Sequence, residues 1–387
     1  MEDGIETKNV IRYNLAISSL QCTNMLQTDT SVASFWVTNP TNDFYGNNAA
    51  GSDFYGIWYE IKANPDGPSA TNDVCPTGNP LGAVYNNTAH SNLFFGLRIF
   101  QFFARQYPCS PIRNDSLDIL PTNPWSQNPS INSTFYNFTI YKNLQNGIMA
   151  EQTGNVFYSN FIVAENYLSG AEFWLANFTA TPPGVVNSAI IGMSNTNAAA
   201  NTSNYTNGGM TALMAGRTGQ FNFTNIRIYN YPVGSVVMQT GRLNDDPLKF
   251  TNLGSEIFVK GLTFNAANGK FLFMIGLKRD VIYDLDGSFA MYFDSTPRAS
   301  ASIVSGWNHI GQHSNCTQAT DNTKWDNAYM CDQSVTIRRV AFANLLVQQN
   351  FKSQFMHVSQ IADVNSLVAS GLSNMSYSSI GTQWLNH

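Results

Sequence analysis

Hydrophobic and polar positions repeat along this chain in short alternating runs. Residues 135–140 (FYNFTI) are echoed by residues 157–162 (FYSNFI), at an offset of 22 to 23 residues. Alternation over a few residues predicts strands with one buried face, and repetition at this period predicts the stacked coils of a solenoid. On this basis Ile140 and Ile162 are expected to lie above one another in the core.

Asparagine and glycine mark the turns between these strands. Asn47 and Asn87 each precede a short turn and a Gly-aliphatic pair, and Asn143 stands shortly before Gly147. Asn and Gly tolerate the left-handed backbone of tight corners, and Asn side chains at equivalent turns can stack into amide ladders. A coil of this kind buries its inward side chains only by stacking on its neighbours. The pattern therefore predicts one elongated unit over residues 1–387.

Three segments lack the periodic apolar positions of a coil. They lie near residues 64–80, 181–209 and 295–335, and the second contains NTNAAANTSNYTNGG. Such polar, Asn-rich and Gly-rich composition is typical of loops. We expect these segments to be insertions that project from the stack.

Several motifs resemble a known family. FWVTNP, NNAAGS, GIWY and PDGPS follow one another within residues 35–69, after EDGIE at 2–6 and before NTAHSN at 87–92. Together they resemble the β-helix of fibrocystin, fibrocystin-like receptors and the cell-migration-inducing hyaluronidases. The resemblance implies an all-β fold, a right-handed parallel β-helix with inserted loops, and the crossover rule gives the same hand.

Composition narrows the function classes. Charged residues make up 12% of the chain, about half the usual share, aromatic residues make up 13%, and the net charge is −5. The single adjacent basic pair is Arg338-Arg339, so a nucleic-acid partner lacks its electrostatic footprint. No signal peptide opens the sequence, and no apolar run reaches the length of a membrane span. Because EDGIE begins at residue 2, we interpret the chain as a fragment of a larger extracellular or cell-surface protein; the resemblance also allows a ciliary membrane.

Sequons for N-linked glycans are numerous, although an Asn-rich chain also produces some by chance. Their density favours a glycoprotein of the secretory pathway, in which N-linked glycans are partners of the chain. The ten acceptors are Asn86, Asn114, Asn132, Asn137, Asn177, Asn201, Asn204, Asn222, Asn315 and Asn374.

Five cysteines are too few for a disulfide scaffold but suit local cross-links in an oxidising compartment. Cys316 and Cys331 bracket a polar insert, and we expect them to pair. Cys75 and Cys109 flank a coil, each beside a proline, and are the next expected pair. Cys22 is left over, either buried as a small apolar residue or paired outside this chain.

Asp3, Glu6 and His90 form the most enzyme-like set, because a polysaccharide hydrolase needs a proton donor and a second carboxylate. The alternative, which we favour, is that EDGIE and His90 belong to turns whose polar groups bond the backbone. We commit to no catalytic residue.

Metal and cofactor motifs are weak, and no metal site or cofactor is predicted. Asp284, Asp286 and Gly287 resemble the start of a calcium loop, but Ser295 stands where such a loop needs glutamate, so a tight turn is favoured. His309 and His313 have helical spacing, yet the surrounding Gly and Asn favour a loop.

Aromatic residues are candidates for stacking on sugar rings. Trp36, Trp58 and Tyr59 also suit the solenoid core, and strand alternation places Trp58 and Tyr59 on opposite faces. The sequence thus predicts a structural or adhesive segment of a large glycosylated fibrocystin-like protein, with extracellular proteins or glycans as partners. The alternative function is a polysaccharide-active enzyme of the hyaluronidase type.

Overall fold

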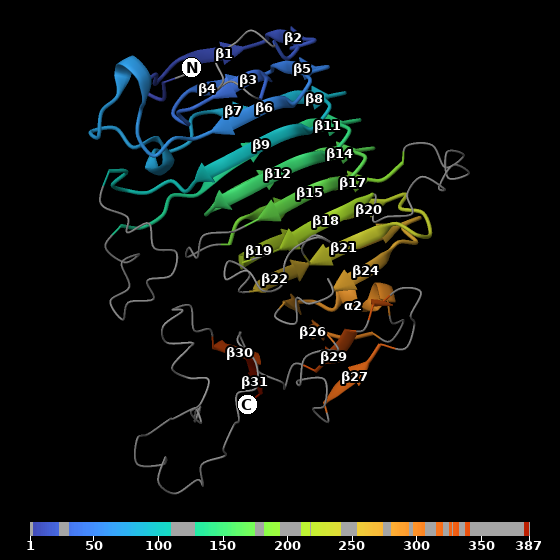
Figure 1. Cartoon of the computed structure of the whole chain (residues 1–387). Coiled ribbons are helices and arrows are strands. Elements are labelled where there is room, and N and C mark those ends of the chain that lie inside the picture. The colour runs from blue at the N-terminus through green and yellow to red at the C-terminus, as the bar shows by residue number, and fades with distance from the viewer. Residues whose placement is uncertain are drawn as a thin grey trace, which may run out of the picture.

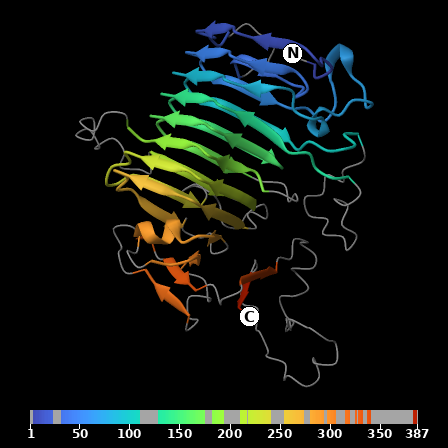
Figure 2. The ribbon, with the colours of Figure 1, turned by 180° about the vertical axis from the view of Figure 1, so that it is seen from behind.

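The chain forms a parallel β-helix, as the sequence predicts (Figure 1). The computed structural model describes residues 3–22, 31–109, 128–174, 182–193, 210–216, 218–240, 254–273, 280–293, 297–305, 315–319, 325–326, 328–332, 337–340 and 383–386. Its strands stack in layers from the N-terminal end, and the view from behind shows the same stack (Figure 2).

Each coil contributes one strand to each of three sheets, which we call sheets A, B and C. Sheet A contains β1 (Val10–Arg12), β4 (Asp43–Tyr45), β7 (Val84–Tyr85), β10 (Ser133–Tyr136), β13 (Val156–Ser159), β16 (Gly184–Val186), β19 (Thr218–Thr224), β22 (Gly254–Lys260), β25 (Val281–Asp284), β26 (Ala301–Ser305), β29 (Ala328–Cys331) and β27 (Cys316–Gln318). Sheet B contains β2 (Leu15–Ile17), β5 (Asn48–Ala50), β8 (Thr88–His90), β11 (Thr139–Tyr141), β14 (Ile162–Ala164), β17 (Ala189–Ile191), β20 (Arg227–Tyr229) and β23 (Thr263–Asn265). Sheet C contains β3 (Ala33–Val37), β6 (Tyr55–Glu60), β9 (Phe95–Phe102), β12 (Asn146–Thr153), β15 (Ser169–Trp174), β18 (Thr211–Gly216), β21 (Val236–Thr240), β24 (Lys270–Phe273) and β28 (Trp325–Asp326).

The remaining described elements are short. They are the 3-10 turns η1 (Gly67–Ser69) and η2 (Pro76–Gly78), the helix α2 (Ser288–Phe293), and the antiparallel pair β30 (Ile337–Val340) and β31 (Gln383–Asn386).

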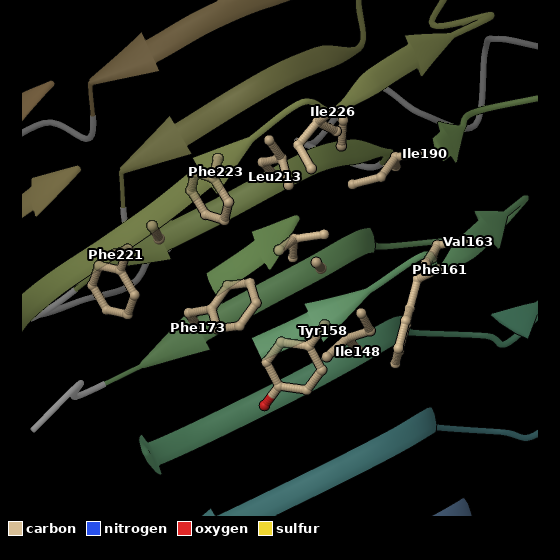
Figure 3. Packing of buried hydrophobic residues seen from close by; sticks show 14 of the residues in the cluster. Ile148, Tyr158, Phe161, Val163, Phe173, Ile190, Leu213, Phe221, Phe223 and Ile226 are labelled. Carbon is tan, nitrogen blue, oxygen red and sulfur yellow. The ribbon is translucent and has the colours of Figure 1, made fainter. Parts of the chain in front are cut away.

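The inward side chains form one continuous apolar column (Figure 3). Phe138 stacks on Phe161 with ring centroids 4.8 Å apart, and Phe135 stacks on Tyr158 at 5.8 Å. Because no coil can bury such rings alone, the stacking itself creates the core.

The register corrects one expectation. Ile140 pairs with Val163, whereas Ile162 pairs with Thr139 and is 48% exposed. The coils repeat here at 23 residues, and a shift of one residue moves a side chain to the opposite face of a strand.

Asparagine ladders line two different corners of the coil. At the corner between sheets A and B, the Asn47 amide donates to the Asn87 side chain (3.2 Å), and at the corner between sheets B and C the Asn143 amide donates to Asn166 (2.8 Å). Asn143 therefore does not continue the ladder of Asn47 and Asn87. In the coil after Asn87 that corner is occupied by Phe138, which the sequence rulers do not distinguish.

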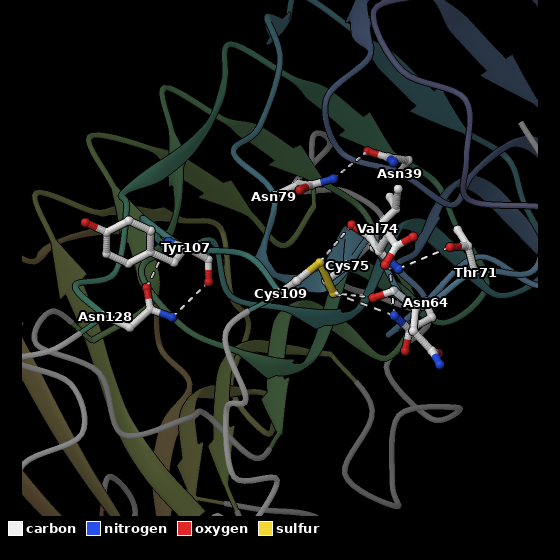
Figure 4. The surroundings of a disulfide bond; sticks show 11 residues. Asn39, Asn64, Thr71, Val74, Cys75, Asn79, Tyr107, Cys109 and Asn128 are labelled. Carbon is white, nitrogen blue, oxygen red and sulfur yellow. Dashed lines mark hydrogen bonds between the residues drawn. A yellow bond between two sulfur atoms is a disulfide. The ribbon is translucent and has the colours of Figure 1, made fainter.

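The three expected insertions differ from one another. Residues 64–80 form a strap with η1 and η2, joined to the segment after β9 by the Cys75–Cys109 disulfide (Figure 4). Within 181–209, by contrast, β16 and β17 are strands of the stack, with Val185 and Ile190 buried. Strands of three residues carry too little pattern to be recognised beside an Asn-rich run.

Parallel stacking gives way to antiparallel pairing after β25. Strands β26, β29 and β27, which fall in the range expected as the third insertion, extend sheet A in antiparallel order. The Cys316–Cys331 disulfide joins β27 to β29, while Cys22 is an exposed free thiol. Both expected cysteine pairs are thus joined in the structure.

Candidate functional site

The carboxylates of Asp3 and Glu6 lie at a different corner from His90. Ser69 Oγ donates to the Asp3 carboxylate (3.0 Å), and the Asn42 amide donates to the backbone oxygen of Glu6 (2.8 Å), at the corner between sheets C and A. His90 ends β8 at the corner between sheets B and C. The structure therefore does not assemble the enzyme-like set as one site.

His90 is held by its neighbours on sheet B. Its ring stacks on Tyr141 with centroids 4.6 Å apart, and Nδ1 lies 3.0 Å from Ser91 Oγ. Burial lowers the pKa of His90. These contacts fit the turn interpretation.

The acidic turn near residue 284 is also accounted for locally. Asp286 accepts from the backbone of Gly261 (2.7 Å), and Asp284 accepts from the backbone of Ala290 (2.8 Å). The carboxylates thus order the turn before α2. Among the described residues, no group of three or more His, Cys, Asp or Glu is placed to hold a metal ion. His309 and His313 lie outside the described residues.

Sequon acceptors are described at five positions. Asn86, Asn132, Asn137 and Asn315 are exposed, and Asn222 is half-buried. Asn114, Asn177, Asn201, Asn204 and Asn374 lie outside the described residues.

The outward face of sheet C gathers more functional side chains than these positions do. The inward side is fixed by Gly96 and Gly147, since a Cβ on Gly147 would lie 2.5 Å from the Val163 side chain. The residue before each such glycine and the residue two after it face outward. We call the outward set the sheet C strip; it comprises Trp36, Trp58, Glu60, Arg98, Phe100, Asn146, Glu151, Ser169, Glu172, Trp174 and Thr211.

Aromatic rings occupy the N-terminal part of the sheet C strip. Trp36 stacks on Trp58 with centroids 5.6 Å apart, and both are half-buried. Tyr59 points the other way and is fully buried, which raises the pKa of Tyr59. The predicted separation of Trp58 and Tyr59 onto opposite faces is confirmed.

Charged groups stand beside these rings. Trp36 Nε1 donates to the Glu60 carboxylate (3.0 Å), and Arg98 pairs with Glu151 at 2.7 Å. Burial raises the pKa of Glu60, and the nearby Lys62 ammonium opposes that rise. The Arg98 and Glu151 side chains are 14% and 17% exposed, so the pair keeps some contact with solvent.

A buried carboxylate lies in the next coil. Glu172 is fully buried and accepts hydrogen bonds from the Asn146 amide and from Trp174 Nε1. The two donors stabilise the charge and orient the half-buried Trp174 ring.

Several polar atoms of the sheet C strip are buried without a hydrogen-bond partner in the part of the chain that the structure describes. Asn146 Oδ1, Ser169 Oγ and Thr211 Oγ1 are such atoms, and they lie in register on β12, β15 and β18. Trp58 Nε1 and Arg98 Nη1 are two further cases. An unpaired buried polar group costs about 1–3 kcal/mol, so a row of them indicates a place where a ligand's polar groups can bind.

Sequence reasoning found Trp36 and Trp58 but missed the charged members of the sheet C strip. These residues are far apart along the chain, and each looks unremarkable by itself. The available signal is the Gly-aliphatic pair: the residue that follows it is Trp58, Arg98, Met149 or Glu172 in successive coils.

Comparison with known proteins confirms the expected relationship. Residues 1–97 match the family model described as CEMIP beta-helix. Fibrocystin-L of Mus musculus is 36% identical over 172 residues, which are 44% of this chain and 4% of that protein. Cell surface hyaluronidase CEMIP2 of Homo sapiens is 34% identical over 125 residues, 26% of this chain and 9% of that protein.

A third relative is the cell migration-inducing and hyaluronan-binding protein of Mus musculus, 40% identical over 73 residues, 18% of this chain and 5% of that protein. The chain thus spans a small part of the length of each of these relatives. Within the described residues, the structure has no helix of the length and apolarity that a membrane span requires.

Proposed function

We propose that this chain is a segment of an extracellular or cell-surface protein, and that its β-helix binds glycans through the sheet C strip. Its role is structural and adhesive: the stacked coils hold the strip in fixed register, and the strip makes the contact. The names of two relatives, a cell surface hyaluronidase and a hyaluronan-binding protein, support both the location and the ligand class.

The observation that carries this proposal is the alternation of half-buried aromatic rings with hydrogen-bonding groups. Trp58, Arg98 and Glu151 occur in successive coils, and Trp174 follows in the next. Sugar rings present apolar C–H faces and polar hydroxyl edges, so a surface of this composition matches them. Amphipathic aromatic groups with a few placed polar atoms are the usual lining of a small-ligand site.

Two further features support a secreted context. The structure contains two disulfides, which form and persist in oxidising compartments. We also propose N-linked glycans at the exposed acceptors Asn86, Asn132, Asn137 and Asn315. Glycans at these positions would hydrate a surface that is poor in charge.

A glycan array probed with the chain, produced in a secretory host, tests the proposal. We expect a defined subset of glycans to bind and Trp58→Ala to reduce their signal at least tenfold. The matched control is Tyr136→Ala, which removes an aromatic ring from the outward face of sheet A, where Tyr136 is 46% exposed. An array without binders, or binding equally insensitive to both substitutions, would overturn the proposal.

Polysaccharide hydrolysis is the second candidate function, and one relationship favours it. Glu172 pairs in register with Met149, two residues before Glu151, so the two glutamates are diagonal neighbours on adjacent strands. Strand geometry puts their backbones about 8 Å apart, which suits the carboxylate separation of a glycosidase. Release of reducing ends from a glycan that binds the array, lost in Glu151→Gln, would establish this activity. Glu6→Gln is the control, because Glu6 lies at another corner.

A further inference from the structure

We infer that the sheet C strip selects uncharged glycans and discriminates against acidic ones. This inference rests on the proposed glycan binding and specifies the class of ligand. It follows from the balance of charge and from the kinds of hydrogen-bonding atoms in the strip.

Negative charge prevails in the strip. Glu60, Glu151 and Glu172 are its acidic members, and Arg98 is its basic member. Arg98 is already neutralised by Glu151 (2.7 Å), and the flanking Lys62 is paired with Asp66 (2.5 Å). Among the described residues of the strip, therefore, no cation is left over for a uronic-acid carboxylate.

Burial strengthens this discrimination. Glu172 is fully buried, and the Glu151 side chain is 17% exposed, so water screens these charges weakly. A second carboxylate brought against them is repelled more strongly than at an open surface, because like charges interact more strongly where the effective dielectric constant is low.

The unpartnered atoms favour the same ligand class. Asn146 Oδ1 is an acceptor and needs a donor, whereas Trp58 Nε1 is a donor and needs an acceptor. A sugar hydroxyl both donates and accepts, and an N-acetyl group offers an N–H and a carbonyl, so an uncharged sugar satisfies both kinds of atom. An ionised carboxylate only accepts and would leave Asn146 Oδ1 unpaired.

The register indicates how such a ligand lies. Asn146, Ser169 and Thr211 occupy equivalent positions on three consecutive strands of sheet C. Neighbouring strands are about 4.8 Å apart, so their oxygens repeat along the axis of the β-helix. An extended oligosaccharide that follows the axis meets one oxygen per coil.

Isothermal titration of the chain with two probes tests the inference. The probes are a neutral N-acetylglucosamine hexamer and an acidic hyaluronan hexamer of similar length. We expect the neutral hexamer to bind at least tenfold more tightly and with little dependence on salt. Equal or tighter binding of the hyaluronan hexamer would overturn the inference while leaving glycan binding intact, whereas the absence of binding to any glycan would overturn both.

A pair of substitutions tests the role of the Arg98–Glu151 pair. Glu151→Gln frees Arg98, and we expect it to narrow the preference by raising hyaluronan affinity at least threefold. Glu165→Gln is the matched control, because it breaks the surface pair of Lys142 and Glu165 (3.7 Å) and changes the net charge equally. If both variants raise hyaluronan affinity by the same factor, net charge alone decides and the local role is overturned.

Discussion

Ile140 lies in register with Val163, and both side chains are fully buried in the column of the β-helix. Ile162, the immediate neighbour of Val163 along the chain, faces outward and is 48% exposed. We expect Ile140→Ala to reduce the free energy of unfolding by about 2–5 kcal/mol, because it leaves a cavity between coils.

Ile162→Ala is the matched control for that prediction, since it removes the same atoms from the outer surface. Its expected effect is within about 0.5 kcal/mol. Denaturant unfolding of the two variants, followed by circular dichroism, measures the difference. Comparable losses in both would mean that the register is wrong.

The Asn143 side chain holds three coils together. Its oxygen accepts from the amide of Asn92 (2.8 Å) and its amide donates to Asn166 (2.8 Å). Asn143→Ala leaves buried partners unsatisfied, so we expect a loss of at least about 2 kcal/mol in the free energy of unfolding. The control is Asn160→Gly at an exposed corner, where glycine keeps the positive φ of 57°. A milder effect for Asn143→Ala than for the control would contradict the ladder.

Asp284 predicts a dependence of stability on pH. Burial raises the pKa of Asp284 to about 6, so the folded protein binds this proton more tightly than the unfolded chain does. Its contribution to stability is therefore present at low pH and is lost as the pH rises from about 4 to about 6, by about 3 kcal/mol. Asp284→Asn should remove this component from a series of unfolding curves between pH 4 and pH 7.

Asp286 gives the opposite slope and serves as the comparison. Although burial acts to raise it, hydrogen bonds from Ser288 and Gly261 lower the pKa of Asp286. The stability that Asp286 contributes is present above its unfolded pKa and is lost as the pH falls through the folded value. Slopes of the same sign for Asp284→Asn and Asp286→Asn would contradict these assignments.

The Cys75–Cys109 disulfide fastens the strap at residues 64–80 across a separation of 34 residues. We expect Cys75→Ser with Cys109→Ser to destabilise the chain by about 3–4 kcal/mol relative to the oxidised protein, as the entropy of a loop of this size indicates. Unfolding with and without reductant measures the effect. A reductant-insensitive transition, with both thiols free in peptide mapping, would contradict the cross-link.

The repeated strand pattern was sufficient to predict the parallel β-helix, because alternation and Asn-Gly corners are properties of the sequence itself. It was insufficient to place Ile140 above Val163, since an offset of 22 or 23 residues decides which face is buried. It also missed β16 and β17, where three-residue strands interrupt an Asn-rich run.

The candidate site was harder to predict for a different reason. Trp58 was recognisable as an exposed aromatic candidate, but Arg98, Glu151 and Glu172 become neighbours only when the coils are stacked in register. Local sequence carries no signal for such pairing across coils of unequal length. The Gly-aliphatic pairs supply the register, and they become useful once the inward position of each glycine is known.

Hydroxyl-radical footprinting with the best glycan from the array tests the central claim most directly, because it reports which face of the β-helix the ligand covers. Trp58 and Trp174 lie on the sheet C strip, and Tyr136 lies on the outward face of sheet A. We predict that saturating glycan lowers the oxidation rate of both tryptophans severalfold and leaves Tyr136 unchanged. Protection of Tyr136 with undiminished oxidation of Trp58 and Trp174 would contradict the account.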